Sequence, residues 1–292
     1  MPSAALIVNA GSRSGVEMAD AAAKELASSG VEIGLNAAAS GDQLPAEIKR
    51  AADQGFEPII VGGGDGTQGI AASVLKGTGK TQAILPLGTG NALARDLGIP
   101  TDLKGACQVI ATGSPITIDL GEANGRVFVN LCSLGLTAEI EANLNSEAKK
   151  KLGRAAYLGP VASALEKATP ISVIVKHSGG FEAFSTLLVG CGPGRTQGGV
   201  LPLPGVAGHQ TGKLAFYAVR STDMAAYAEL LWRLSQGTWM EMGTLFHLEA
   251  EEIEIQTDPV QKVVVDGEPA VETPLKLRCL PGALKVLVPS ES

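Results

Sequence analysis

The chain has 292 residues, of which 45% are hydrophobic, 18% are charged and 4% are aromatic, and its formal net charge is −7. This length suits two domains with a substantial core, and the apolar content excludes a disordered chain. The acidic balance argues against nucleic acid as the main partner, because a phosphate backbone attracts a basic protein face.

The sequence pattern also bears on the cellular compartment. No apolar run approaches the ~20 residues that a bilayer-spanning helix needs, and residues 1–15 lack the basic and apolar regions of a secretory signal. The four cysteines are scattered and form no CxxC pair: Cys107, Cys132, Cys191 and Cys279. This spacing is typical of reduced thiols rather than of a disulfide framework or a zinc site. We therefore expect a cytoplasmic protein.

Residues 1–115 alternate short apolar strands with amphipathic helices, which predicts an α/β domain with a parallel sheet. The expected strands span residues 4–8, 31–35, 58–61 and 83–87. The expected helices span residues 16–28, 44–54 and 103–111, with two more that follow glycine loops and end at Leu75 and Leu97.

From about residue 116 onward, strands follow one another with turns between them, which predicts a mainly antiparallel second domain over residues 116–292. The expected strands span residues 116–120, 127–131, 171–176, 183–189, 214–219, 253–256, 263–265, 275–279 and 284–288. Two helices are expected, at 146–167 and 223–236. The alternative that the last strands return to the first domain stays open.

Three loops rich in small residues each follow an expected strand and precede a helix. They read Asn9-Ala-Gly-Ser-Arg-Ser-Gly15, Gly62-Gly-Gly-Asp-Gly-Thr67 and Gly88-Thr-Gly-Asn91. Because the carboxyl ends of parallel strands share one edge of the sheet, these loops should converge there. Helix N-termini at that edge favour phosphate. Glycines also serve tight turns alone, but three such loops together favour a phosphate-binding crevice.

Two familiar motifs fit less well. Gly64-Asp-Gly-Thr-Gln-Gly69 matches GxGxxG, but the next strand ends without the carboxylate that dinucleotide-binding proteins carry about 20 positions on. Gly77-Thr-Gly-Lys-Thr81 has the ending of a Walker A loop, but Val74 stands where its first glycine belongs and the segment precedes a strand. We reject both.

Asp65 is the only carboxylate within the three loops, and two interpretations are open for it. It is either a cap for the amides of the helix that follows, or a carboxylate that meets phosphate oxygens through a bridging Mg²⁺.

Two motifs, Gly63-Gly-Asp-Gly-Thr67 and Pro86-Leu-Gly-Thr-Gly-Asn-Ala-Leu-Ala-Arg95, resemble the catalytic domain of the diacylglycerol kinase-like lipid kinases. This group includes sphingosine and ceramide kinases and the soluble bacterial lipid kinases. NAD kinases and phosphofructokinases have loops similar to the first motif, whereas the second is more specific. Further matches extend over nearly the whole chain, at 151–157, 198–204, 263–268 and 281–289.

The resemblance implies an NAD-kinase-like α/β domain at 1–115 that binds nucleotide and a β-rich, sandwich-like lipid-substrate domain at 116–292, with the active site between them. It also implies Mg²⁺-dependent transfer of the γ-phosphoryl group of ATP to a lipid hydroxyl, diacylglycerol-like or sphingoid, in phospholipid biosynthesis. The family pattern places these residues around the nucleotide: Asn9, Ser14, Gly63, Gly64, Gly66, Thr67, Gly88, Thr89 and Asn91.

Asp266-Gly267 follows an apolar strand and is a strong signal for a type I′ hairpin turn. A phosphoryl-transfer enzyme also needs a carboxylate that accepts the proton of the nucleophile. The resemblance implies that Asp266 is this general base, with Glu268 as its acidic companion, and that Asp65 and Glu268 hold the metal. Whether Asp65 or Asp266 is the base stays open.

Four residues depart from the family pattern: Ala37, Gly69, Ala92 and Thr211. Thr211 replaces an aspartate of a structural Mg²⁺ site in bacterial members, so no metal is expected there. Two alternatives therefore stay open, an NAD kinase-like enzyme and a nucleotide- or lipid-binding protein that has lost catalysis.

Lys149-Lys-Lys151 with Arg154 is a compact basic run. It is either a solvated helix face or a contact with an anionic membrane surface, where each basic residue contributes ~1 kcal/mol. The expected partner is a lipid substrate at that surface, a homodimer is left open, and no nucleic-acid partner is expected.

Overall fold

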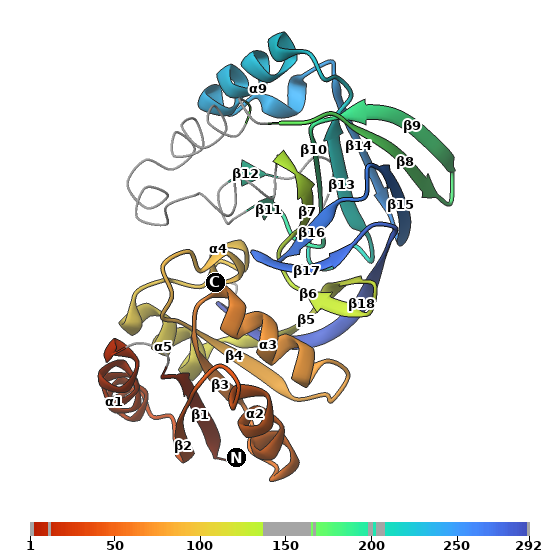
Figure 1. Cartoon of the computed structure of the whole chain (residues 1–292). Helices are drawn as coiled ribbons and strands as arrows, with labels where there is room; N and C mark the ends of the chain where they lie inside the picture. Colours follow the sequence, from red (N-terminus) through yellow and green to blue (C-terminus); the bar gives the residue numbers. More distant parts are fainter. Residues whose placement is uncertain are drawn as a thin grey trace. The chain divides into compact units, whose positions relative to one another are not determined.

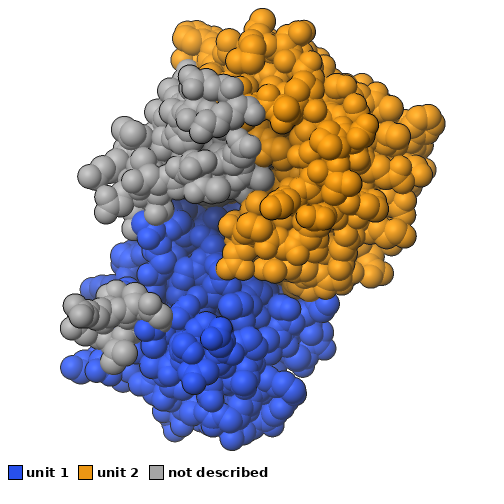
Figure 2. All heavy atoms as spheres, in the orientation of Figure 1, with its two compact units in different colours: residues 1–118, 282–292 blue, residues 119–281 orange. Residues whose placement is uncertain are grey.

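The computed structural model describes residues 3–10, 13–136, 165, 168–197, 201–202 and 208–290. Two compact units make up the chain, residues 1–118 with 282–292 (unit 1) and residues 119–281 (unit 2), which Figure 2 colours separately. Apart from Leu165, the expected helix at 146–167 lies outside the described residues, as do the basic run and the family matches at Gly198, Gly199 and Pro204.

Unit 1 is built on a parallel sheet in the order β2-β1-β3-β4, with the end of β18 added beside β4. Its strands are β1 (Ala4–Asn9), β2 (Ile33–Ala39), β3 (Ile59–Gly63) and β4 (Thr81–Pro86). Its helices are α1 (Arg13–Ser28), α2 (Leu44–Asp53), α3 (Asp65–Leu75), α4 (Ala92–Asp96) and α5 (Leu103–Thr112). Helix α1 packs with α5 and α2 packs with α3, so helices cover both faces of the sheet (Figure 1). This cover explains why β3 and β4 are buried along their whole length.

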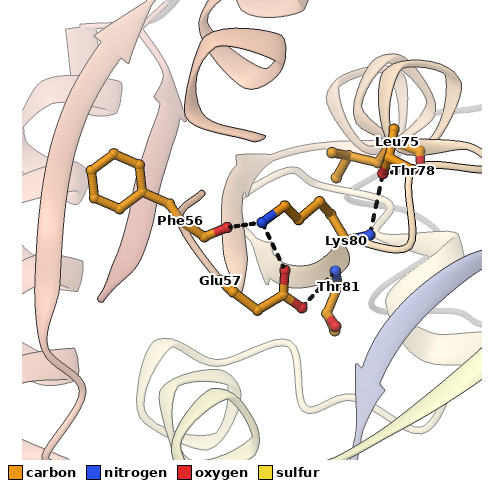
Figure 3. A network of polar contacts seen from close by, with 6 residues as sticks. All are labelled: Phe56, Glu57, Leu75, Thr78, Lys80 and Thr81. Carbon is orange, nitrogen blue, oxygen red and sulfur yellow. Dashed lines mark hydrogen bonds and ion pairs between the residues drawn. The ribbon is translucent and has the colours of Figure 1, made fainter. Parts of the chain in front are cut away.

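The amino end of β4 carries a network of polar contacts (Figure 3). The Lys80 ammonium donates to the carbonyl of Phe56 at 3.3 Å and lies 3.9 Å from the Glu57 carboxylate. Glu57 in turn accepts the backbone N–H of Thr81 at 2.9 Å. Lys80 thus lies at the amino edge of the sheet, whereas the glycine loops follow the carboxyl ends of the strands.

Unit 2 is mainly antiparallel and contains parts of two large sheets, β18-β15-β8-β9 with β5 and β6, and β14-β13-β10-β7-β16-β17. The strands, of which β5 begins and β18 ends in unit 1, are β5 (Ser114–Ala123), β6 (Arg126–Phe128), β7 (Cys132–Gly135), β8 (Ile171–His177), β9 (Gly180–Thr186), β10 (Leu188–Gly192), β11 (Thr196–Gln197), β12 (Leu201–Pro202), β13 (Leu214–Val219), β14 (Leu245–Ala250), β15 (Glu252–Asp258), β16 (Lys262–Val265), β17 (Glu268–Glu272) and β18 (Leu275–Val288). Helix α9 (Met224–Gln236) and the 3₁₀ turn η2 (Trp239–Glu241) complete the described elements.

The main core of unit 2 lies between its two sheets. Val173 and Ile255 on the first sheet and Phe216 and Val263 on the second belong to one buried cluster. A second cluster joins the other face of the second sheet to α9, with Tyr227 fully buried in it. The expected fold class, an α/β domain followed by a β-rich antiparallel domain, is confirmed.

The predicted division into strands is wrong at two places in this part of the chain. The expected strand at 183–189 is two strands, β9 and β10, which belong to different sheets. The chain leaves the first ladder because the N–H of Leu187 donates to the Tyr227 hydroxyl at 2.8 Å and that of Leu188 to Thr186 Oγ1 at 3.1 Å. The expected strands at 275–279 and 284–288 are one strand, β18, which pairs with β15 in unit 2 and with β4 in unit 1.

Within the described part of the chain, none of the helices has both the length and the apolar character needed to cross a lipid bilayer.

Candidate functional site

Two of the three glycine loops touch each other at the carboxyl edge of the unit 1 sheet. The N–H of Leu87 donates to the carbonyl of Gly63 at 3.0 Å. A Cβ built on Gly88 would lie 2.4 Å from the Cα of Gly64, so no side chain fits at this contact. The sequence prediction that these loops converge is therefore correct, and glycine is required where they meet.

The first loop is tied to the same place by Asn9 at the end of β1. Its side-chain amide donates to the Thr67 hydroxyl, in the first turn of α3, at 2.9 Å. Thr67 is buried, and a Cβ on Gly63 would clash with its side chain. These contacts fix the shape of the Gly62–Thr67 loop from both sides.

Asn91 organises the Gly88–Asn91 loop from within. Its Oδ1 accepts the N–H of Gly88 at 3.0 Å, and its Nδ2 donates to the carbonyl of Gly88 at 2.8 Å and that of Pro86 at 3.3 Å. The residue is buried and has a left-handed φ of 50°. Asparagine tolerates this backbone better than most residues. The Asn91 side chain therefore shapes the loop, while Thr89 is exposed.

Asp65 does not cap its own helix, so that interpretation was wrong. The N-cap of α3 is Gly64 in an extended conformation, and no side chain caps the helix. Asp65 is the first residue of α3, and its Oδ1 accepts the N–H of Leu93, in the first turn of α4, at 3.3 Å. Its Oδ2 lies 2.9 Å from where a Cβ on Gly90 would stand. The carboxylate thus joins the two motifs.

The first turn of α3 suits an anion. Its first intrahelical bond runs from the N–H of Gln68 to the carbonyl of Gly64. The amides of Asp65, Gly66 and Thr67 precede it, and helix geometry leaves these donors without an intrahelical acceptor. With the helix dipole they fit a phosphate group.

Asp65 is the main potential metal ligand that the described residues of this site provide. No group of three or more His, Cys, Asp or Glu side chains able to hold a metal occurs within the described ranges. Mg²⁺ commonly uses one or two carboxylates and takes its other ligands from phosphate oxygens and water. Asp65 beside a phosphate-binding turn fits that mode.

Asp266 lies in unit 2, at the predicted two-residue turn between β16 and β17. Val265 pairs with Glu268, and Asp266 and Gly267 have φ of 50° and 87°, as a type I′ turn requires. The Asp266 carboxylate accepts three consecutive backbone amides, those of Val129 and Asn130 at 2.8 Å and that of Leu131 at 3.1 Å.

These amide contacts correct the expected strand at 127–131. Strand β6 ends at Phe128, because the next three amides turn to Asp266 instead of to a neighbouring strand. Nothing in the local sequence of this segment signals the contact. Residues 129–131 are therefore the part of the candidate site that sequence reasoning missed.

The remaining predicted site residues have different surroundings. Glu268 is exposed, and its carboxylate forms an ion pair with Arg126 at 3.0 Å. Ser14 lies in α1. Arg95, the last residue of the second motif, donates from Nε to the carbonyl of Gly90 at 3.1 Å and so supports the Gly88–Asn91 loop.

Two family models match successive parts of the chain. The diacylglycerol kinase catalytic domain matches residues 3–123, and the YegS C-terminal NAD kinase beta sandwich-like domain matches residues 130–288. The latter match alone covers more than half of the chain.

Individual proteins agree with these matches. A Synechocystis protein described as uncharacterized is 30% identical over an alignment of 276 residues that covers 88% of this chain and 62% of that protein, so this chain spans less than two thirds of it. The Pseudomonas aeruginosa protein named "Probable lipid kinase YegS-like" is 32% identical over 297 residues, covering 98% of this chain and 95% of that one. A crystal structure described as a diacylglycerol kinase from Bacillus anthracis has a TM-score of 0.80 at 26% identity, over 98% of this chain and 96% of that one.

An α/β unit with joined glycine loops, together with a β-rich unit, defines the NAD-kinase-like class of fold. Within that class, the chain belongs to the diacylglycerol kinase-like lipid kinases of the YegS type.

Proposed function

We propose that this chain transfers the γ-phosphoryl group of ATP to a hydroxyl group of a lipid, either diacylglycerol-like or sphingoid. Family membership supports a lipid kinase. The observation that carries the nucleotide site is the contact of the two motif loops at Gly64 and Gly88, beside the uncapped first turn of α3.

The nucleotide-binding residues divide into two groups by what their atoms do. The backbone amides of Gly64, Gly66 and Thr67 are proposed to bind phosphate oxygens, with the exposed Thr89 beside them. The side chains of Asn9 and Asn91 are proposed to act through the loops, since Asn9 bonds to the Thr67 hydroxyl and Asn91 bonds to the backbone of Gly88. Gly63 and Gly88 allow the close contacts, and Ser14 completes the proposed set.

Asp65 is proposed to act among the phosphates. Its carboxylate would hold Mg²⁺, which would supply neutralisation of the phosphate charge. The bond of Asp65 to the Leu93 amide holds its carboxylate at a fixed place beside both loops. A phosphoryl-transfer enzyme acts mainly by orienting the reacting groups, since the protein takes little covalent part in the reaction.

Asp266 is proposed to accept the proton of the lipid hydroxyl while the lipid oxygen bonds to the γ-phosphorus and the bond to the β-phosphate oxygen breaks. Its three amide bonds hold the carboxylate in one orientation. Asp65 remains the alternative base.

Glu268 is proposed as the second carboxylate for the metal. Its ion pair with Arg126 is exposed, with side chains 69% and 44% accessible. Exposed pairs contribute only about 0–1 kcal/mol, so exchange of Arg126 for a cation costs little.

The acceptor is identified by incubating the purified chain with γ-³²P-labelled ATP and Mg²⁺ in three separate mixtures, with diacylglycerol, with sphingosine and with NAD. Labelled lipid on a thin-layer plate supports the proposal and names the acceptor. Labelled NADP would support an NAD kinase-like enzyme instead. No labelled product, with ATP binding retained, would support a protein that has lost catalysis.

A further inference from the structure

Two glutamine side chains are buried where the beginning of α3 meets the sheet of unit 1. Helix α3 packs on β3 and β4 (Figure 1). Gln68 in the helix is 3% exposed, and Gln82 in β4 is fully buried. Strands of a parallel sheet that is covered on both faces are usually continuous apolar runs. A buried amide inside such a strand therefore requires a physical explanation.

The two side chains form a chain of hydrogen bonds that runs in one direction. Gln82 Nε2 donates to Gln68 Oε1 at 2.8 Å and to the backbone carbonyl of Gln68 at 3.4 Å. Gln68 Nε2 donates in turn to the carbonyl of Val61, in β3, at 2.9 Å. The beginning of α3 is thereby bonded to both of the strands on which the helix packs.

This arrangement leaves one buried acceptor unpaired. Gln82 Oε1 is buried, and no group of the described residues donates a hydrogen bond to it. The direction of the bonds is fixed, because the Val61 carbonyl can only accept and Gln68 must present its Nε2 to it. An unpaired buried acceptor destabilises a fold, whereas two apolar side chains of the same size would avoid this loss. Stability alone therefore does not account for the pair.

We propose that Gln68 and Gln82 are positioning residues, which hold the first turn of α3 in the orientation that binds the phosphates of ATP. The inference rests on the proposed function, in which the amides at the start of α3 bind phosphate. The N–H of Gln68 forms the first intrahelical bond, to the carbonyl of Gly64 at 3.0 Å, directly after the amides of residues 65–67. Fixing Gln68 therefore fixes the direction of those amides. Donors that are already ordered bind a ligand with a smaller loss of conformational entropy.

A double variant, Gln68→Met with Gln82→Met, distinguishes this role from a purely structural one. Methionine has nearly the size of glutamine, and the two changes remove every side-chain polar group of the pair, including the unpaired Oε1. The urea midpoint of unfolding should therefore be no lower than that of the wild-type chain. The dissociation constant for ATP with Mg²⁺, measured by calorimetry, should nevertheless rise about fivefold, as expected for the loss of one ordinary hydrogen bond. Hydrogen exchange at the Gln68 amide, measured without nucleotide, should become faster by a similar factor.

Gln108→Met is the matched control, because Gln108 is exposed in α5 and its side chain donates to Thr112 of the same helix at 3.4 Å. The same chemical change there should leave the urea midpoint, the dissociation constant for ATP and the exchange at Gln68 unchanged.

Three results of the double variant overturn the proposal. One is an unchanged exchange rate at Gln68, and another is unchanged binding of ATP where the wild-type chain binds it. The third is a lower urea midpoint, because the pair then serves stability. A wild-type chain that does not bind ATP, together with faster exchange at Gln68 in the double variant, would contradict the proposed function and still support the hold of the pair on α3.

Discussion

The side-chain amide of Asn9 donates to the hydroxyl of Thr67 at 2.9 Å, and this bond joins residues 58 positions apart in the chain. It connects the end of β1 to the first turn of α3, the turn whose amides we propose to hold phosphate. Neither residue needs to touch the nucleotide for the bond to matter, because it sets the position of those amides.

Asn9→Ala and Thr67→Val should each raise the KM for ATP by about fivefold to tenfold, because a lost hydrogen bond of this kind costs about 1 kcal/mol. The double variant should lose no more than either single one, since both remove the same bond. Steady-state kinetics at saturating lipid measures this. Effects that simply add would contradict the assigned role of the bond.

Gly88→Ala should destabilise the protein by about 1–3 kcal/mol and lower activity strongly, because the new Cβ would lie 2.4 Å from the Gly64 backbone. Gly41→Ala is the control, since a Cβ there has no atom within 4 Å. Urea unfolding followed by circular dichroism measures both. Equal stabilities for the two variants would show that the loops do not meet as described.

Asp266→Asn should abolish turnover and also cost about 1–3 kcal/mol of stability, because an amide nitrogen cannot accept a backbone N–H. Hydrogen exchange at Val129, Asn130 and Leu131 should become faster. Glu268→Gln should change stability by less than about 1 kcal/mol, since it removes an exposed ion pair. Full activity in Asp266→Asn would remove this residue from the mechanism.

Buried thiols predict a loss of stability at alkaline pH. Desolvation raises the pKa of Cys107 to about 11 and that of Cys279 to about 12. The unfolded chain releases these protons near 9.0, the ordinary pKa of a thiol, while the folded chain still holds them. The contribution of these thiols to the free energy of unfolding should therefore be complete below pH 9 and should decrease as the pH rises toward 11.

Cys107→Ala separates this contribution from other groups that titrate in the same range. The free energy of unfolding is measured in urea at pH 8 and at pH 10. From pH 8 to pH 10 it should decrease less in the variant than in the wild-type chain. An identical fall in both proteins would show that the Cys107 thiol contributes nothing to the pH dependence.

Most of the first unit followed from the sequence because each local signal agreed with the next. The buried strands of its parallel sheet are short apolar runs, and glycine loops mark their ends, so β3 and the start of α3 lie close to where the pattern placed them. The turn at Asp266 and Gly267 was equally clear, because few residue pairs favour two left-handed backbones in succession.

The errors arose where a distant residue decides the local structure. Tyr227 diverts the backbone at Leu187, which separates β9 from β10, and Asp266 ends β6 at Phe128. Asp65 binds an amide 28 positions away instead of capping its own helix. Local propensity carries no information about such partners, so neither the amides at 129–131 nor the contact of Asp65 with Leu93 could be predicted.

We propose that Asp65, held beside two joined glycine loops, takes part in phosphoryl transfer from ATP to a lipid. The most direct measurement compares wild-type chain and Asp65→Asn for transfer of ³²P from γ-labelled ATP into lipid, with circular dichroism to confirm that both are folded. The wild-type chain should produce labelled lipid, and Asp65→Asn should produce at least a hundredfold less, on the order expected when a catalytic group is removed. Equal labelling by the two proteins would contradict it.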